Sequence, residues 1–266
     1  MTQQEIIHMV KNLADQTIIS QKELHKLLNE PLNVLLDFWY AINETFPNYS
    51  YGDNSRLANH DLVKKLYDNA QQYGIQIGTV SNNDDLITGI ILLVTTLNAN
   101  NLIKYTGDIL EKHQDRVMST AKKIYPHSDR IIPNDKIVNQ TFKGHSWSQR
   151  IWSDQRKLKR DLKKIITKEL TNNKNPVSKT KLIRDRFNVT ENQARRIIIT
   201  ETARVMSAQS LVNARNSGYN KVIWVANSNA CDECLPEDGK VFTLSQAEGL
   251  QPKHPNCKCS WAPYFV

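Results

Sequence analysis

Apolar residues recur with helical spacing along most of the chain. In residues 3–19 they fall three or four positions apart, at Ile6, Val10 and Leu13, which predicts an amphipathic helix. Residues 221–226 instead form a β-branched, apolar run that is typical of a strand. The helical pattern predicts further helices over residues 32–46, 57–73, 84–124, 147–170, 178–187 and 190–217.

Local signals predict where several of these helices begin and end. Ser20 and Glu23 have the spacing of a capping box, and Pro31 is expected to interrupt the chain before the next helix. Gly74 is a natural left-handed stop. Gly107 leaves open whether the longest predicted segment forms one helix or two shorter ones.

The predicted fold class is mainly α, with an N-terminal helical region, a basic helical bundle and a small zinc-stabilised α+β subdomain at the C-terminal end. Residues 125–145 show little periodicity, so we interpret them as a linker or an extended arm. We place one domain at residues 1–139 and a second at 140–266, with the metal subdomain at 221–266.

Charge is concentrated in the middle of the chain. The net charge is +8, but residues 134–230 alone carry 20 Lys and Arg against seven Asp and Glu. Such a block attracts phosphate backbones, although long basic helices often present only a solvated face. The candidate nucleic-acid contacts on these helices are Arg156, Lys159, Arg160, Lys163, Lys164, Arg195 and Arg196.

Residues 178–199 have the outline of a helix-turn-helix. Ser178 would cap a short first helix, and Thr190 would open a second helix after a turn at 188–189. Capped helices joined by a short turn also occur in bundles that do not bind DNA. The pattern alone therefore leaves DNA contact open.

Neither a membrane span nor an export signal is expected. No run of about 18 apolar residues is present. The first residues lack the basic start and apolar block of a signal peptide. We therefore expect no membrane partner and a reducing cytoplasm, where cysteines bind metals more often than they form disulfides.

All four cysteines follow residue 230. Cys231 and Cys234 have the spacing of a metal-binding knuckle, and a second cluster offers His254, Cys257 and Cys259. Zn²⁺ takes four such ligands in a closed structural site. The first four of these residues are the leading ligand set, with Cys259 as a substitute for His254 or Cys257.

Other interpretations of the cysteines remain open, namely short strained disulfides, a redox pair and free thiols. A thioredoxin-like pair needs a helix after the first cysteine, whereas Pro236 and the turn signal Asp238-Gly239 follow here. Metal binding is favoured because a bound ion supplies on the order of 10 kcal/mol to a segment too short to fold by apolar burial.

Glu201 falls on the apolar stripe of its predicted helix, where an unpaired carboxylate is costly. Arg204, three residues further on, is its natural partner. We favour a pair that locks the helix, or a contact to the Cys-rich end, over a catalytic carboxylate.

An ordered set of motifs spans much of the C-terminal half. It runs through Trp147–Trp152, Arg195-Arg196, Thr200–Arg204, Gly218-Tyr219, Trp224, Cys231-x-x-Cys234, Asp238–Phe242 and His254–Cys259. The combination resembles the phage Mu F-type minor head protein family, also called the phage head morphogenesis domain. Lys258 departs from the arginine that is usual in that family.

The resemblance implies a non-enzymatic minor structural protein of tailed-phage heads that acts beside the portal. The implied partners are portal or capsid protein, with no small-molecule substrate, and the implied location is the virion and, during assembly, the host cytoplasm. We expect Trp224 and Phe242 to pack beneath the zinc-bound tip and to tie it to the helix of Glu201 and Arg204. Asp238 and Gly239 are expected to have a structural role as a turn.

Two alternatives from other functional classes are kept. The first is a DNA-binding packaging or ejection factor, with double-stranded DNA as partner, because of the basic segment. The second, less favoured, is an HNH-like nuclease. That chemistry needs a histidine base beside a metal with an open position, whereas His254 lies within ligand spacing of the thiolates.

Overall fold

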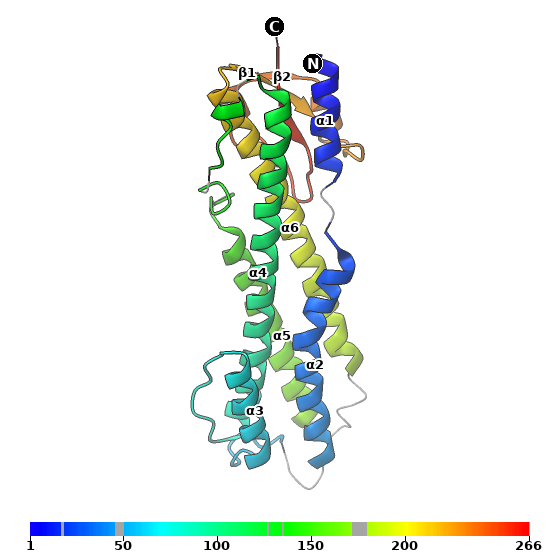
Figure 1. The fold of residues 1–266 in the computed structure, drawn as a ribbon. Coiled ribbons are helices and arrows are strands. Elements are labelled where there is room, and N and C mark those ends of the chain that lie inside the picture. Colours follow the sequence, from blue (N-terminus) through cyan, green and yellow to red (C-terminus); the bar gives the residue numbers. More distant parts are fainter. Residues whose placement is uncertain (17–18, 46–50, 127, 135, 172–179, 266) are drawn as a thin grey trace. The chain divides into compact units, whose positions relative to one another are not determined.

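The structure is a computed structural model that describes residues 1–16, 19–45, 51–126, 128–134, 136–171 and 180–265. Helices predominate and a small antiparallel sheet lies near the C-terminus, which confirms the predicted fold class (Figure 1). The helices are α1 (Gln3–Asp15), α2 (Gln21–Thr45), α3 (His60–Gln72), α4 (Asn83–Ile124), α5 (Trp147–Thr171), α6 (Thr180–Asn216) and α7 (Leu244–Ala247). Two 3₁₀ turns, η1 (Ser128–Arg130) and η3 (Leu235–Glu237), accompany strands β1 (Lys221–Val225), β2 (Val241–Thr243) and β3 (Ser260–Pro263).

The chain forms two compact units that are interleaved in sequence. Helices α4, α5 and α6 each contribute residues to both units. The domains predicted with a boundary between residues 139 and 140 stay a prediction. The first unit consists of residues 1–19, 104–150 and 195–266, and the second of residues 20–103 and 151–194.

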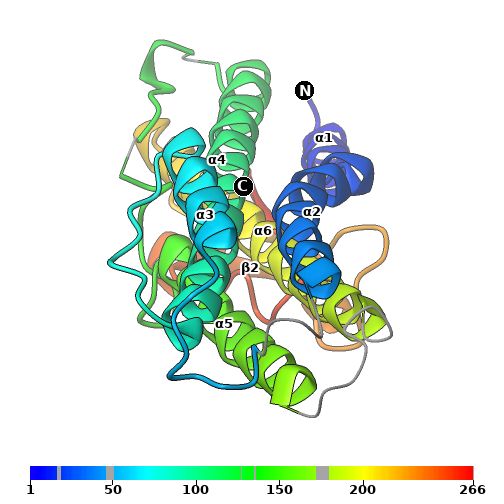
Figure 2. The same ribbon diagram turned by 90° about the horizontal axis from the view of Figure 1, so that it is seen from below.

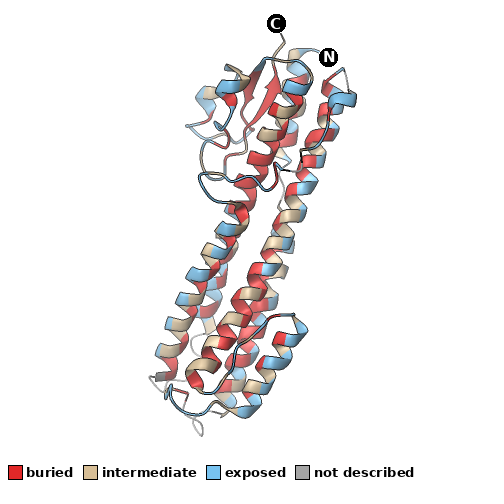
Figure 3. Ribbon diagram, turned by 90° about the vertical axis from the view of Figure 1, so that its left-hand side faces the viewer, coloured by how far each residue is buried: buried red, intermediate tan, exposed pale blue. Residues whose placement is uncertain are grey.

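The second unit has a core formed by the apolar sides of its helices. Figure 2 shows α2, α3 and α5 from below, and Figure 3 shows buried positions along one side of each long helix and exposed positions along the other. The buried side chains include Leu35, Trp39, Leu66, Leu93 and Leu162. This one-sided burial is what the helical spacing predicts.

Pro31 does not interrupt the chain, contrary to the sequence-based prediction. Helix α2 continues through it. A proline inside a helix costs about 3 kcal/mol through a lost hydrogen bond and a steric clash. The apolar stripe continues on both sides of the proline, at Leu24, Leu28, Leu32 and Leu35, all buried. Packing of this stripe outweighs the local cost.

Helix α4 continues through Gly107, so the longest predicted segment forms one helix and not two shorter ones. It is also long and apolar enough to cross a membrane by length and composition alone. This conclusion rests on an 18-residue window of the helix, and 67% of that window is buried inside the protein, as is usual for a core helix. The window is therefore more apolar than we expected from the sequence, where no membrane span was predicted. A single such helix is weak evidence for a membrane span.

The sheet of the first unit has the strand order β2-β1-β3, with both pairs antiparallel. Helix α1 packs on β3 and β1, as Figure 1 shows near the two termini. The Gln3 side chain donates to the Pro263 carbonyl and accepts from the Phe265 backbone N–H, at 2.9 and 3.0 Å. An N-terminal helix therefore covers a C-terminal strand.

The segment 125–145, predicted as a linker or arm, is instead packed within the first unit. Ile131, Ile137 and Val138 are buried. The carbonyl of Asn134 accepts from the Gln114 side chain at 3.0 Å. The segment lacks periodicity because its backbone is irregular. Side chains of α4 and α6 donate to several of its carbonyls, namely those of Ile132, Asn134, Ile137 and Val138.

The predicted helix-turn-helix is wrong. Helix α6 runs without a break through residues 188–189, and Ser178 lies outside the described residues. The Thr190 hydroxyl donates to the Arg186 carbonyl at 3.1 Å, so Thr190 is inside a helix and caps nothing. The buried side chains Ile183, Phe187 and Ala194 continue one stripe across the predicted turn.

Candidate metal centre

Two backbone turns present the first four candidate ligands. The Cys234 N–H donates to the Cys231 carbonyl at 2.9 Å and closes one turn. The Cys257 N–H donates to the His254 carbonyl at 3.1 Å and closes the other. Each turn therefore places two donor side chains three residues apart on the same loop.

The donor atoms of the two turns lie close together. His254 Nε2 is 3.0 Å from Cys231 Sγ and 3.2 Å from Cys234 Sγ. Cys234 Sγ and Cys257 Sγ are 3.8 Å apart. A tetrahedral zinc ion with Zn–S bonds of about 2.3 Å separates its sulfurs by roughly 3.8 Å. The spacing of the Cys234 and Cys257 sulfurs fits such an ion.

The histidine ring is oriented for ligation. His254 Nδ1 lies 2.8 Å from the Pro255 carbonyl, a contact that requires the proton to be on Nδ1. Nε2 then presents its lone pair toward the sulfurs. A second contact that fixes the tautomer in this way is usual for metal-binding histidines.

Cys259 lies in the same cluster. Its donor atom and those of Cys234 and Cys257 are all within 4.8 Å of one another, and all three residues are buried. Cys231, by contrast, is exposed. The five residues predicted from sequence thus form two overlapping groups that share Cys234, and either group could hold a metal ion.

Burial and the closeness of neighbouring thiols shift the pKa values of the cysteines in this cluster. Burial, followed by the neighbouring Cys257, raises the pKa of Cys234 to about 12. A hydrogen bond with Cys259 lowers the pKa of Cys257 to about 5. Several thiolates cannot share this space without a counter-charge, and a divalent cation supplies one.

An aromatic cluster supports the tip from the sheet. Trp224 on β1 is paired with Trp261 on β3, and their ring centroids are 5.1 Å apart. Phe242 on β2 lies 6.3 Å from Trp224 and 5.4 Å from Trp261. Sequence reasoning named Trp224 and Phe242 but missed Trp261, whose signal was a short apolar run directly after Cys259.

Asp238 and Gly239 lie in the loop that leads into β2 and fix its backbone conformation. The Asp238 carboxylate accepts from the Ala226 N–H at 2.8 Å. Gly239 has φ +78°, a conformation that favours glycine, and its N–H donates to the Trp224 carbonyl at 3.0 Å. These residues do not form a two-residue hairpin, because the Cys231–Cys234 turn also lies between β1 and β2.

Glu201 is fully buried and has two arginine partners. Arg204 Nε donates to it at 2.6 Å and Arg150 at 2.8 Å. Arg204 also donates to the carbonyls of Ile137 and Val138, at 2.8 and 3.0 Å. The buried charges thus tie α6 to the irregular segment. Arg150, which also donates to the Phe142 carbonyl, was not anticipated.

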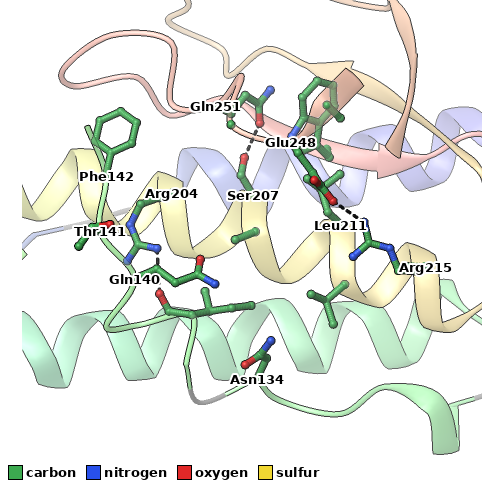
Figure 4. Close-up of a pocket in the computed structure, with 16 residues that line it drawn as sticks. Asn134, Gln140, Thr141, Phe142, Arg204, Ser207, Leu211, Arg215, Glu248 and Gln251 are labelled. Atoms are coloured by element: carbon green, nitrogen blue, oxygen red, sulfur yellow. Dashed lines mark hydrogen bonds and ion pairs between the residues drawn. The ribbon is translucent and has the colours of Figure 1, made fainter. Parts of the chain in front are cut away.

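A pocket of about 440 Å³ lies beside this network in the first unit. Figure 4 shows Arg204 and Ser207 of α6 facing it, with Gln140 on the irregular segment. Ser207 donates to Gln251 across its rim, and Arg215 pairs with Glu248. Of the site residues predicted from sequence, Arg204 alone lines this pocket.

The candidate nucleic-acid contacts divide into three groups. Arg156, Arg160 and Lys164 are exposed on α5 at intervals of four residues, whereas Lys159 is half-buried. Lys163 pairs with Asp84 at 3.2 Å and is committed to that contact. Arg195 and Arg196 are exposed on α6, in the first unit.

The fold and the site together define a class of protein. It is a helical protein with a small C-terminal sheet, and turns that contain Cys and His near this sheet could hold a metal ion. Residues 160–262 match the model of the family described as Phage Mu protein F like protein. The resemblance seen in the sequence is thereby confirmed for this part of the chain. Searches of curated proteins and of solved structures returned no match.

Proposed function

We propose that the protein is a non-enzymatic minor head morphogenesis protein of a tailed bacteriophage. The match of residues 160–262 to the phage Mu F-like family carries this proposal. On this proposal the protein binds portal or capsid protein, and it is located in the host cytoplasm during assembly and in the virion afterwards.

The chemistry of the cluster supports a structural role. The cluster offers two overlapping groups of three donors, Cys231/Cys234/His254 and Cys234/Cys257/Cys259. Four ligands drawn from these donors would fill a tetrahedral shell and leave no open position for a substrate or an activated water. An HNH-like nuclease would need such a position and a free histidine base. His254 points its Nε2 at two sulfurs instead.

The test is co-expression of the tagged chain with the portal and capsid proteins encoded in the same genome. The expected result is retention of portal or capsid protein at moderate salt, and the presence of this chain in purified heads. Its absence from heads, together with no retention of either protein, would contradict the proposal.

DNA contact is the second candidate, and one feature of α5 favours it. Arg156, Arg160, Lys164 and Lys168 are all exposed and lie four residues apart, with the exposed Trp152 at the head of the row. Successive members are about 6 Å apart along the helix. Within the described residues none of these four cations has an ion pair. They are therefore available to phosphates.

This candidate is tested by the salt dependence of DNA retention. Replacing Arg160 and Lys164 with glutamine should reduce the slope of log affinity against log salt by roughly 0.9 for each lost phosphate contact. Lys157→Gln is the matched control, because Lys157 is exposed on the same helix but paired with Asp154. Equal effects of both changes, or no DNA retention at low salt, would contradict it.

A further inference from the structure

One face of helix α6 forms the floor of the pocket in the first unit. Arg204, Leu211 and Arg215 lie along it in that order (Figure 4), and Ala208 and Val212 lie between the two arginines. The arginines are eleven positions apart, which is about 16 Å along a helix. The floor is therefore apolar in its middle and cationic at both ends, and an extended chain of about five residues matches its length.

The walls of the pocket are two irregular segments. Residues 134–142 lie on one side of α6 and residues 247–251 on the other (Figure 4). Gln140 and Thr141 are exposed at the rim, where their side chains can hydrogen-bond to the peptide groups of a ligand. The volume of about 440 Å³ is within the range of pockets that bind ligands.

One end of the pocket carries a positive charge in excess. Glu201 pairs with Arg204 and with Arg150, so that within the described residues two guanidinium groups share one carboxylate. Of the five N–H groups of Arg204, three are used by Glu201 and by two backbone carbonyls. A second anion would balance this network, because a buried charge without a partner is costly.

The pocket is also lined by a hydrogen-bond donor that lacks an acceptor. Trp261 is 1% exposed, and within the described residues its indole N–H has no hydrogen-bond partner. Buried polar groups are nearly always hydrogen-bonded. A carbonyl oxygen of a bound ligand would provide the acceptor.

We propose that this pocket binds the carboxyl-terminal residues of a partner protein, with apolar side chains on the floor, the terminal carboxylate at Arg204 and a main-chain carbonyl at Trp261. Arg215 at the other end is already paired with Glu248, so the carboxylate is drawn to Arg204. A chain terminus places its charge on the main chain directly beside an apolar side chain, which matches an arginine next to an apolar floor. The inference goes beyond the proposed function and does not depend on the family match.

The test is binding of the full-length protein to an array of pentapeptides that differ in their apolar residues. Each peptide is made with a free carboxyl terminus and as the terminal amide. Several free acids should be retained, and their amides should bind about tenfold more weakly or less, because a charge-assisted hydrogen bond is lost. A third set, with an internal glutamate and an amidated end, should not be retained.

Two variants test the residues of the pocket. Trp261→Phe removes the indole donor and keeps an aromatic ring, so the affinity for the retained peptides should fall roughly three- to tenfold. Trp224→Phe is the matched control, because Trp224 packs on Trp261 and its N–H also lacks a partner within the described residues, but it lies outside the pocket. Ala208→Phe, which fills the floor, should abolish binding.

Several results would overturn the proposal. They are equal binding of free acids and amides, retention of the internal-glutamate set alone, no retention of any peptide, or equal losses of affinity in Trp261→Phe and Trp224→Phe. If Trp261→Phe does not fold, Ala208→Phe on the half-buried floor replaces it. The comparison of acids with amides tests the proposal without any variant.

Discussion

The backbone N–H of Asn256 donates to the hydroxyl of Thr200 over 3.0 Å, and this hydrogen bond fastens the His254–Cys257 turn, the second of the two turns with candidate ligands, to helix α6. Asn256 has φ +64°, a left-handed conformation that asparagine tolerates. The same hydroxyl donates to the Arg196 carbonyl at 2.7 Å. One buried side chain thus joins the helix to the candidate metal centre.

Replacing Thr200 with valine should destabilise the protein by about 1–3 kcal/mol, because the Asn256 N–H is left without its acceptor. Zinc affinity should fall as well, since the second turn loses its support. Both effects can be measured, by chemical denaturation and by chelator competition.

Thr190→Val is the matched control for this change. Thr190 is equally buried on α6, but within the described residues its hydroxyl has one hydrogen bond, to the Arg186 carbonyl of its own helix. The control should therefore change the stability little and leave zinc affinity unaffected. Equal losses in the two variants would mean that the Asn256 contact has no special importance.

Replacing Cys231 with serine should unfold the tip and leave the helices intact. A bound ion would hold together two turns that are far apart in sequence, whereas the helices of the second unit have an apolar core without residues of the tip. Zinc content should fall, and the emission of Trp224 and Trp261 should shift toward that of exposed indole. The helical circular dichroism signal should be largely unchanged. Unaltered melting and metal content would show that Cys231 is not a ligand.

The candidate centre could be predicted from sequence because its signal is local. Cys231/Cys234 and His254/Cys257 each lie within four residues, and the turns that join them are short. The partners of Glu201 could be predicted only in part. Arg204 is one helical turn away, whereas Arg150 lies on another helix and reaches Glu201 only through the tertiary fold.

Helix continuity was harder to predict, because local signals competed with packing. Pro31 and the capping pattern at Thr190 both indicate boundaries, yet α2 and α6 run through them. In each case buried apolar residues continue on both sides, and burial of one such side chain is worth about 1.5–3 kcal/mol. The free energy gained by burying a few such side chains therefore exceeds the local preference for a helix boundary.

Neutralising Glu201 should be strongly destabilising. In Glu201→Gln the buried Arg204 loses its charged partner, and breaking a buried ion pair on one side costs about 3–5 kcal/mol. Glu248→Gln is the matched control, because its pair with Arg215 is exposed and such pairs contribute about 1 kcal/mol at most. Denaturant titrations of both variants give the comparison. A loss below about 1 kcal/mol for Glu201→Gln would indicate that the network is not important for stability.

His113 should make stability depend on pH in the acid range. It is buried on α4, and burial, reinforced by Arg116 and Lys112, lowers its pKa from 6.5 to about 4. The unfolded chain therefore binds a proton at a higher pH than the folded chain does. The contribution of neutral His113 is complete above pH 6.5 and is lost as the pH falls toward about 4, by up to ~3 kcal/mol.

This dependence can be isolated with the variant His113→Gln, which cannot titrate. Metal ligands also take up protons in this range, but they do so in both proteins, so the difference between the two stability curves reports on His113. The wild-type curve should fall more steeply below pH 6.5 than that of the variant. His8→Gln, a change at an exposed histidine, should follow the wild-type curve. Parallel curves for wild type and His113→Gln would mean that His113 is protonated equally in the folded and unfolded chains.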